Sequence, residues 1–163
     1  MRDLEELGIV PRRKNPYPPA TDEQVEAFEA AFGVTLPDDF VAFLKAANGG
    51  RPTLSSAYQD PAGGTGEVDD FHGLGPRAAD EAVAAADPDD WDVGDLWGET
   101  RVRREYLGRG VPFGRDGGDN PFFLDFACDP PCVSRYAIAT RTIHRIAPSF
   151  SAFLDLLRPA SDT

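Results

Sequence analysis

The stretch EAAFGVTLPDDFVAFLKAANGG, residues 29–50, holds the end of one helical pattern and the whole of a second. The first pattern begins after Thr21, whose hydroxyl can cap a helix while Gln24 returns the hydrogen bond. Apolar residues then recur on one face: Val25, Phe28 and Phe32. Gly33 follows the last of them, so we expect a helix that begins after Thr21 and ends at Gly33.

The second pattern begins at Leu36-Pro37-Asp38-Asp39, with a proline in the first turn and two carboxylates at the positive end of the helix dipole. Its apolar residues again lie on one face: Phe40, Phe43, Leu44 and Ala47. Asn48-Gly49-Gly50 should end this helix, because glycine and asparagine adopt left-handed backbone most easily.

Outward from this pair, the C-terminal part of the chain changes to strand patterns. Four of them, VPFG, NPFFLDF, CVSRYAIA and TIHRIA, occupy residues 111–147 and alternate with turn residues, which is typical of an antiparallel meander. Pro148-Ser149 then precedes a last amphipathic helix with Phe150, Phe153, Leu154 and Leu157 on one face. The fold class is therefore α+β, with a meander sheet packed against two N-terminal helices and one C-terminal helix.

The remaining segments are predicted from turn and charge signals. The pieces LSSAY and EVDDFHGL within residues 51–75 are candidate short strands, and residues 76–86 form a candidate helix opened by Pro76. We expect residues 1–20 to be an arm before the domain, because residues 11–20 (PRRKNPYPPA) favour extended backbone. A single domain over residues 21–158 and a tail over residues 159–163 complete the assignment.

The loop GRDGGDNPFFLDF, residues 114–126, raises the question of a metal or phosphate site. It lacks the ligand spacing and the final glutamate of a calcium loop, and it has no lysine of the kind that phosphate loops carry. Gly117, Gly118 and Asn120 accept positive φ between two half-buried strands. We therefore expect a hairpin turn here, and no metal or cofactor.

Four segments of the chain, in this order, resemble the SUKH superfamily, also known as the fungal cell-wall assembly regulator family. They are residues 29–50 quoted above, FHGLGP at 71–76, VPFGRDGGDNPFFLDF at 111–126 and APSFSAFLDLL at 147–157. The resemblance covers about residues 21–158 and implies an α+β fold. It also implies an immunity protein that neutralises a cognate toxin, as in most bacterial members, or a cell-wall signalling scaffold, as in fungal members.

The net charge of −12 is concentrated in one part of the chain. Residues 1–59 have 9 acids and 6 bases (−3), residues 60–99 have 12 acids and 1 base (−11), and residues 100–163 have 7 acids and 9 bases (+2). Such a distribution argues against direct nucleic-acid binding, which needs clustered Lys and Arg, and favours a basic protein partner. The alternative is that the acids only keep the protein soluble.

The candidate partner-binding residues lie in DPDDWDVGDLWGE, residues 87–99, which we expect to be an acidic loop, and in a second cluster at Asp69 and Asp70. The loop residues in question are Asp87, Asp89, Asp90, Trp91, Asp92, Asp95, Trp97 and Glu99. Each tryptophan either pins the loop onto the sheet or stands exposed as an aromatic anchor for the partner.

Catalysis is the less favoured class. Ser149 is better used as a helix cap, His144 lies in a predicted strand, and a carboxylate pair such as Asp69 with Asp125 is selected by nothing but abundance. A metal site from His72, Asp69 and Asp70 has only local clustering in its favour. Cys128 and Cys132 are expected to be reduced structural thiols, with a zinc site or a redox pair as alternatives.

The sequence thus predicts a non-catalytic binding module, most consistent with a bacterial immunity protein against a nuclease or nucleic-acid deaminase toxin. A scaffold or regulatory adaptor is the alternative, and a hydrolase is a third. The chain has no run of apolar residues long enough for a signal peptide or membrane span, so we expect a cytoplasmic protein without a membrane partner, and a monomer.

Overall fold

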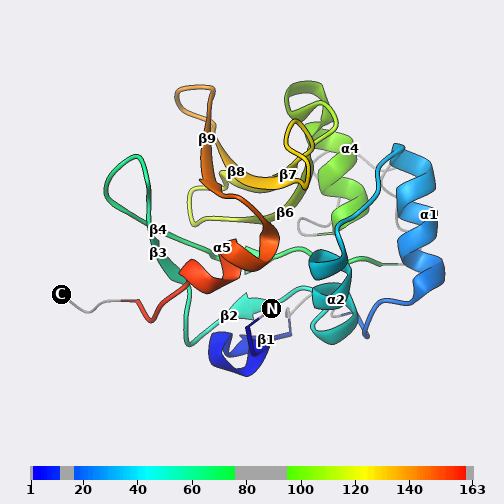
Figure 1. The fold of residues 1–163 in the computed structure, drawn as a ribbon, viewed down its shortest axis with the longest axis horizontal. Helices are drawn as coiled ribbons and strands as arrows, with labels where there is room; N and C mark the ends of the chain where they lie inside the picture. Colours follow the sequence, from blue (N-terminus) through cyan, green and yellow to red (C-terminus); the bar gives the residue numbers. More distant parts are fainter. Residues whose placement is uncertain (1, 12–16, 76–94, 161–163) are drawn as a thin grey trace.

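A five-stranded antiparallel sheet organises the computed structural model, which describes residues 2–11, 17–75 and 95–160 (Figure 1). The strand order is β5-β6-β7-β8-β9, so neighbours in the sequence are neighbours in the sheet. The strands are β5 (Asp70–Phe71), β6 (Val111–Arg115), β7 (Pro121–Asp125), β8 (Cys132–Ala137) and β9 (Thr142–Ala147). The predicted meander over residues 111–147 is confirmed, with β5 added at its edge.

The helices α1 (Asp22–Phe32), α2 (Asp38–Ala46) and α5 (Phe150–Leu156) form where the sequence predicts them. Thr21 caps α1, with its hydroxyl accepting from the Gln24 N–H at 3.2 Å while the Gln24 side chain accepts from the Thr21 N–H at 3.0 Å. Gly33 ends the helix in left-handed backbone. Ser149 caps α5 by accepting from the Ala152 N–H at 3.1 Å.

The core lies between the sheet and the helices α2 and α5. Phe40 and Phe150 meet edge to face with ring centroids 5.0 Å apart, and Phe43 lies 5.0 Å from Phe71 of β5. Burying one such ring contributes about 1.5–3 kcal/mol. The predicted inward residues of these helices are all buried, apart from Ala47, which is partly buried: Val25, Phe28, Phe32, Leu36, Phe40, Phe43, Leu44, Phe150, Phe153, Leu154 and Leu157.

The N-terminal segment corrects the expectation of a separate arm over residues 1–20. Residues Leu4–Leu7 form a 3-10 helix (η1), and β1 (Ile9–Val10) pairs with β2 (Arg51–Pro52). The Leu7 side chain is fully buried in the core. Its burial, together with the pairing of β1, explains why residues 2–10 pack against the domain.

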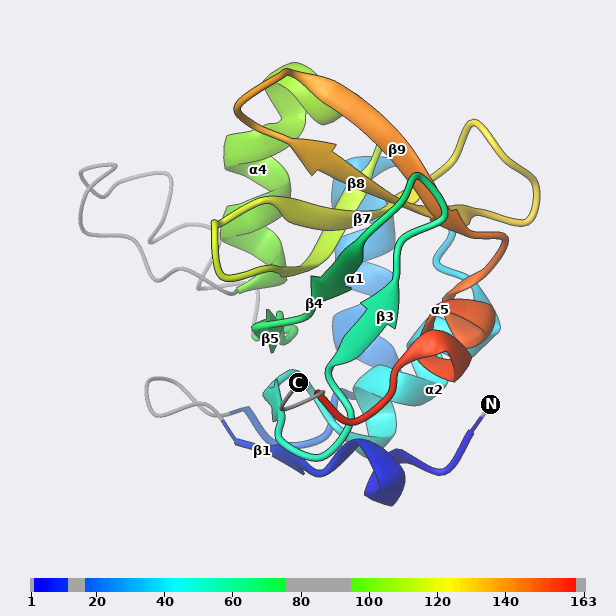
Figure 2. The ribbon, with the colours of Figure 1, turned by 90° about the vertical axis from the view of Figure 1, so that its left-hand side faces the viewer.

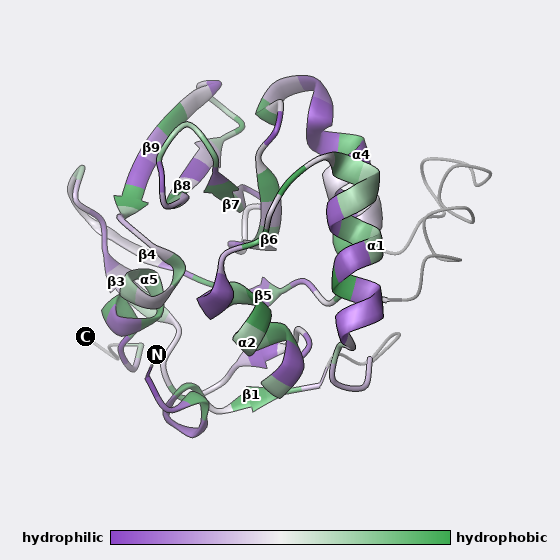
Figure 3. Ribbon diagram, turned by 45° about the vertical axis from the view of Figure 1, so that its right-hand side comes forward, coloured by the Kyte–Doolittle hydropathy of each residue, from purple (hydrophilic) through white to green (hydrophobic). Residues whose placement is uncertain are grey.

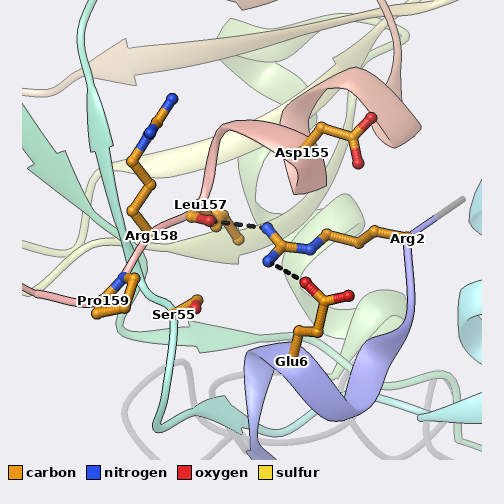
Figure 4. Close-up of a pocket in the computed structure, with 7 residues that line it drawn as sticks. All are labelled: Arg2, Glu6, Ser55, Asp155, Leu157, Arg158 and Pro159. Carbon is orange, nitrogen blue, oxygen red and sulfur yellow. Dashed lines mark hydrogen bonds and ion pairs between the residues drawn. The ribbon is translucent and has the colours of Figure 1, made fainter.

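Arg2 fastens this segment to the end of α5 (Figure 4). Its guanidinium donates to the carbonyl oxygens of Leu154 at 2.6 Å and Leu157 at 2.7 Å, and it pairs with Glu6 at 3.0 Å. A shallow pocket of about 400 Å³ lies beside it, lined by Arg2, Glu6, Ser55, Asp155, Leu157, Arg158 and Pro159.

A second small hairpin covers the other end of the core. Strands β3 (Ala57–Gln59) and β4 (Thr65–Glu67) pair with each other (Figure 2). The ring of Tyr58 in β3 contacts Phe122 and Phe153. The predicted strand in LSSAY is therefore shorter than its sequence pattern. The predicted strand in EVDDFHGL becomes the end of β4 and the separate strand β5.

The two cysteines differ from their predicted state, because Cys128 and Cys132 form a disulfide. The turn after β7 brings their Cα atoms to 5.6 Å, which lies within the usual range for this bond. Arg145 of β9 donates to the Cys128 sulfur at 3.0 Å. The expectation of reduced thiols is therefore wrong for this structure.

Candidate partner-binding site

The residues on either side of the acidic stretch 76–94 lie next to each other in the structure. Gly73 bridges to Asp95, and the Leu96 N–H donates to the Gly73 carbonyl at 2.8 Å. The indole N–H of Trp97 donates to the Gly75 carbonyl at 3.0 Å. Residues 76–94, which hold six acids and one base, therefore connect two backbone positions that are tied together. The predicted helix at 76–86 and the predicted site residues Asp87, Asp89, Asp90, Trp91 and Asp92 lie outside the described residues.

The expectation of a loop through Glu99 is wrong, because α4 (Leu96–Leu107) begins directly after Asp95. The Asp95 carboxylate accepts from the Trp97 N–H at 2.8 Å and the Gly98 N–H at 3.4 Å, and so caps the helix. Its side chain is buried, and burial raises the pKa of Asp95, although hydrogen bonds from Tyr17 and the Trp97 N–H partly offset the rise. Asp95 therefore does not present a charge to a partner.

Of the two alternatives for Trp97, a buried anchor or an exposed binding residue, the structure shows the buried one. The side chain is fully buried, with its ring 5.3 Å from Phe28 and 5.7 Å from Phe32 between centroids. These contacts join α4 to α1, which lie side by side in Figure 1. Trp97 thus anchors the returning end of the acidic stretch to the core and is not a binding residue.

Glu99 belongs to a group of charged side chains that connects α4 to the β6–β7 turn, which we call the charged cluster. Its members range from the fully buried Glu99 to Asp119, whose side chain is 53% exposed. Arg103, one turn further along the helix, donates to Glu99 at 2.7 Å and lies 3.3 Å from Asp119 of the β6–β7 turn. Arg115 of β6 lies 3.4 Å from Asp119 and 3.1 Å from Asp70 of β5. The cluster consists of Asp70, Glu99, Arg103, Arg115 and Asp119.

Burial dominates the electrostatics of this cluster. Burial raises the pKa of the Glu99 carboxyl, and the charge of Arg103 reverses only part of that rise. One Glu99 oxygen accepts from Arg103 while the other has no hydrogen-bond partner. Burial alone would lower the pKa of Arg103, but Glu99 and Tyr106 raise it above its ordinary value. The cluster therefore holds α4 against the hairpin instead of facing a partner.

Asp69 and Asp70, the second predicted pair, point to different environments. Asp70 is buried and bonded to Arg115, whereas the side chain of Asp69 is 41% exposed and lies 4.0 Å from Arg51. Of the five predicted residues in the described part of the chain, Asp69 alone keeps a charge at the surface. The structure therefore brings Asp70, Asp95, Trp97 and Glu99 together beneath the surface, as supports of the acidic stretch.

The carboxylate pair proposed for catalysis is not a pair in space. The Asp69 N–H donates to Arg115 at one end of the β6–β7 hairpin, while Asp125 ends β7 at the other. Four residues of strand separate these ends by about 13 Å. Glycoside hydrolysis needs carboxyl groups about 5–9.5 Å apart. Among the described residues no group of three or more His, Cys, Asp or Glu could hold a metal ion.

Sequence reasoning missed α4, although signals for it exist. Asp95 is a good N-cap, Glu99 and Arg103 are spaced for a helical ion pair, and Gly108 follows the last turn. The acids before residue 95 made the whole stretch resemble a loop. The residues missed with α4 include Arg103 and Tyr106, which connect the helix to the sheet.

The fold defines a class of protein: a small α+β domain whose antiparallel meander is packed against α2 and α5 on one side of the core. The chain matches the model of the SMI1 / KNR4 family (SUKH-1) over residues 19–156, and it belongs to this family. The predicted resemblance is thereby confirmed. No curated protein matches the chain. None of the described helices has the length and apolar character to cross a membrane.

Proposed function

We propose that this chain is a non-catalytic immunity protein that binds and neutralises a cognate toxin domain. Membership of the SUKH-1 family supports a binding or regulatory module. The observation that carries the finer proposal is the acidic stretch of residues 76–94, whose two ends are fixed side by side at Gly75 and Asp95. The two fixed ends bring six acids and one base, consecutive in the sequence, to one position on the domain.

The buried acids reduce the charge that a partner meets, but they do not remove it. Asp70, Asp95 and Glu99 are part of the −11 of residues 60–99 and are buried. The stretch 76–94 alone carries six acids against one base, a net −5, and Asp69 adds a partly exposed carboxylate. A toxin that cuts or edits nucleic acid needs a basic groove for phosphate, and these acids complement such a groove.

The proposal is tested first by whether a toxin-like domain is encoded next to this gene, and then with that domain. We expect co-expression to restore growth of cells that make the toxin, and the purified proteins to form a 1:1 complex that abolishes its activity on nucleic acid. A complex that forms without loss of toxin activity would support an adaptor instead. The absence of any complex would overturn the proposal.

The salt dependence of association tests the chemistry of the partner separately. Steered association should exceed the unsteered rate constant of about 10⁵–10⁶ M⁻¹s⁻¹ at low salt and fall steeply as salt is added. Stopped-flow measurement at several ionic strengths gives the slope. A rate constant that does not change with salt would exclude a basic groove as the target.

We also propose that the protein acts in the cytoplasm, where a toxin that attacks nucleic acid must be neutralised. The disulfide argues against this location, because such bonds rarely persist in the reducing cytosol. Alkylation of the cysteines in intact cells, followed by mass spectrometry, decides the point. Cysteines that remain protected from alkylation would contradict the cytoplasmic proposal.

A further inference from the structure

The last strand of the sheet, β9, has a neighbour on one side only. It pairs with β8 from Thr142 to Ala147 and ends the strand order. Within the part of the chain that the structure describes, no strand pairs with its other edge. An unpaired edge presents backbone N–H and C=O groups that an added strand can bond.

Apolar side chains continue from this strand onto α4 across the outer face of the sheet. Ile143 of β9 is opposite Tyr136 of β8 in the register, so both lie on one face, and Ile143 is 52% exposed. The Tyr136 ring contacts Tyr106 of α4, with centroids 4.5 Å apart. Val102 lies one turn before Tyr106 and is 45% exposed. We call Val102, Tyr106, Tyr136 and Ile143 the apolar stripe.

The charge around this stripe is opposite to that of the whole chain. Residues 130–154 hold three arginines and no Asp or Glu, in a protein with net charge −12. Arg135 is paired with Asp116 at 2.8 Å, but Arg141 and Arg145 are exposed. Arg145 is opposite Ser134 and therefore shares a face with Ile143. Figure 3 shows that β9 contains both hydrophobic and hydrophilic residues. The edge strand thus combines an apolar residue with cations, where an acidic ligand is favoured.

We propose that β9 and the apolar stripe bind an extended acidic segment of a partner protein, which adds to the sheet as a sixth strand. Backbone hydrogen bonds to β9 would hold the segment in place. Apolar side chains of the segment would pack on Ile143 and Tyr136, and its carboxylates would face Arg141 and Arg145. Because Ile143 and Arg145 lie on the same face of the sheet, every second residue of the segment would face them, and these facing residues must in turn be acidic, apolar and acidic. This pattern provides specificity.

A second copy of this chain does not fit the same edge. If two β9 strands paired antiparallel about Ile143, Arg141 of each, in the turn directly before the strand, would lie near Arg145 of the other, and like charges brought together in this way are destabilising. Two molecules of net charge −12 also repel each other. An acidic partner avoids the repulsion between arginines, because its carboxylates would occupy the positions that the arginines of a second copy would take.

This surface is separate from the one in the proposed function. Asp95, which anchors the acidic stretch, caps the start of α4, whereas Tyr106 lies in its last turn. Eleven residues of helix separate them by about 16 Å. The protein therefore has an acidic element at one end of α4 and a cationic, apolar edge at the other, and each can be tested without the other.

The experiment uses the full chain labelled with nitrogen-15 and the eight-residue peptide Glu-Ser-Val-Ser-Glu-Ser-Val-Ser, in which the glutamates and valines share one face of an extended strand. We expect the peptide at low salt to shift the amide signals of residues 142–147 and of Tyr136. Arg141→Glu with Arg145→Glu should weaken binding at least tenfold, whereas Arg158→Glu, an exposed arginine at the end of α5, should not. A peptide with lysine in place of glutamate should not bind.

Three outcomes would overturn the proposal. They are shifts that map away from β9, equal binding by the double reversal, and equal binding by the lysine peptide. Because both arginines are exposed, the amide spectrum of the double variant should show an intact fold. Sedimentation of the chain alone at high concentration tests whether a second copy binds this edge. Self-association that is lost in the variant Arg141→Glu with Arg145→Glu would assign the edge to a second copy instead.

Discussion

Asp116 shows at the scale of one residue why the loop at 114–126 is a turn and not a metal site. Its carboxylate accepts from the N–H groups of Gly118 and Asn120 and from the Asn120 side chain, and it pairs with Arg135. The carboxylate oxygens are therefore used within the hairpin. The sequence indicated positive φ at the glycines, but the structure places it at Asp119, with φ 65°, because Asp116 fixes the turn from its start.

Asp116→Asn should lower stability at neutral pH and alter its dependence on acid. Burial would raise the pKa of Asp116, but the Asn120 N–H and Arg135 together hold it below its ordinary value of 3.8. The stabilisation is therefore present above pH 3.8 and is lost as the pH falls through the lower, folded value. Loss of the charged hydrogen bonds should cost about 1–3 kcal/mol at pH 7.

Urea unfolding of both proteins between pH 2 and pH 7 measures this difference as the gap between the two curves. The gap should close as the pH falls below about 4. Asp155→Asn, on the exposed side of α5, is the control and should leave stability nearly unchanged. A gap that is constant with pH would show that the Asp116 charge is not responsible.

Cys128→Ser with Cys132→Ser tests the disulfide. A crosslink across so few residues restricts the unfolded chain only modestly, so its loss should cost at most about 2 kcal/mol. Partner affinity should stay nearly intact, because the bond lies in the β7–β8 turn and not beside the anchor of the acidic stretch. Calorimetric titration with the partner measures the affinity, and a loss of tenfold or more would make this turn part of the interface.

At the scale of elements, what could be predicted depended on how local the determining signal is. The helices α1, α2 and α5 have caps and apolar faces within a few residues, and β6 to β9 alternate with turn residues, so local reasoning identified them. Pairing of β1 with β2 joins residues 9–10 to 51–52 and has no local signal. For α4, the six acids of residues 87–99 outweighed the helical spacing of Glu99 and Arg103.

In the candidate site, too, local features could be predicted from the sequence and features set by distant residues could not. Composition identified the acidic stretch correctly as the most charged part of the chain, but burial divides residues that composition treats alike. Asp95 and Glu99 are buried because one caps α4 and the other pairs with Arg103, and both partners are set by tertiary structure. Trp97 is buried because α1 supplies Phe28 and Phe32. Such distinctions cannot be made from the sequence of the stretch alone.

Leu7→Ala tests whether the N-terminal segment is part of the cooperative fold. The side chain is fully buried, and removing a buried leucine side chain costs about 2–5 kcal/mol. Leu54→Ala is a matched control, because Leu54 lies beside the same segment but is 60% exposed. Thermal unfolding measures both variants. Equal stability of Leu7→Ala and the parent would show that residues 2–10 are an independent arm after all.

At the scale of the whole molecule, charge is arranged in two ways. Acids that stabilise the fold are paired below the surface, as Glu99 with Arg103 and Asp70 with Arg115. Acids that exceed the available bases are concentrated in the sequence between Gly75 and Asp95. We expect the second group to be changeable without unfolding the protein, because surface charges contribute little to stability, whereas removing one partner of a buried pair is destabilising. Substitutions in the two groups should therefore have different effects: changes in the acidic stretch should reduce partner binding, and changes in the buried pairs should reduce stability.

Reversal of Asp89, Asp90 and Asp92 to lysine changes the net charge of residues 76–94 from −5 to +1. If these acids face a basic groove, the reversal should abolish partner binding or weaken it at least a hundredfold, since unfavourable charge pairs at an interface cost several kcal/mol. The melting temperature should stay near that of the parent, because solvated charges stabilise little.

Glu99→Ala is the opposite control. It leaves the buried Arg103 without its closest partner and should lower the melting temperature, while the protein that remains folded keeps its partner affinity. Equilibrium binding and thermal unfolding on the same samples distinguish the two effects. A triple variant that binds as tightly as the parent would exclude this stretch as the interface, and the partner would then have to bind another surface, such as the edge of β9.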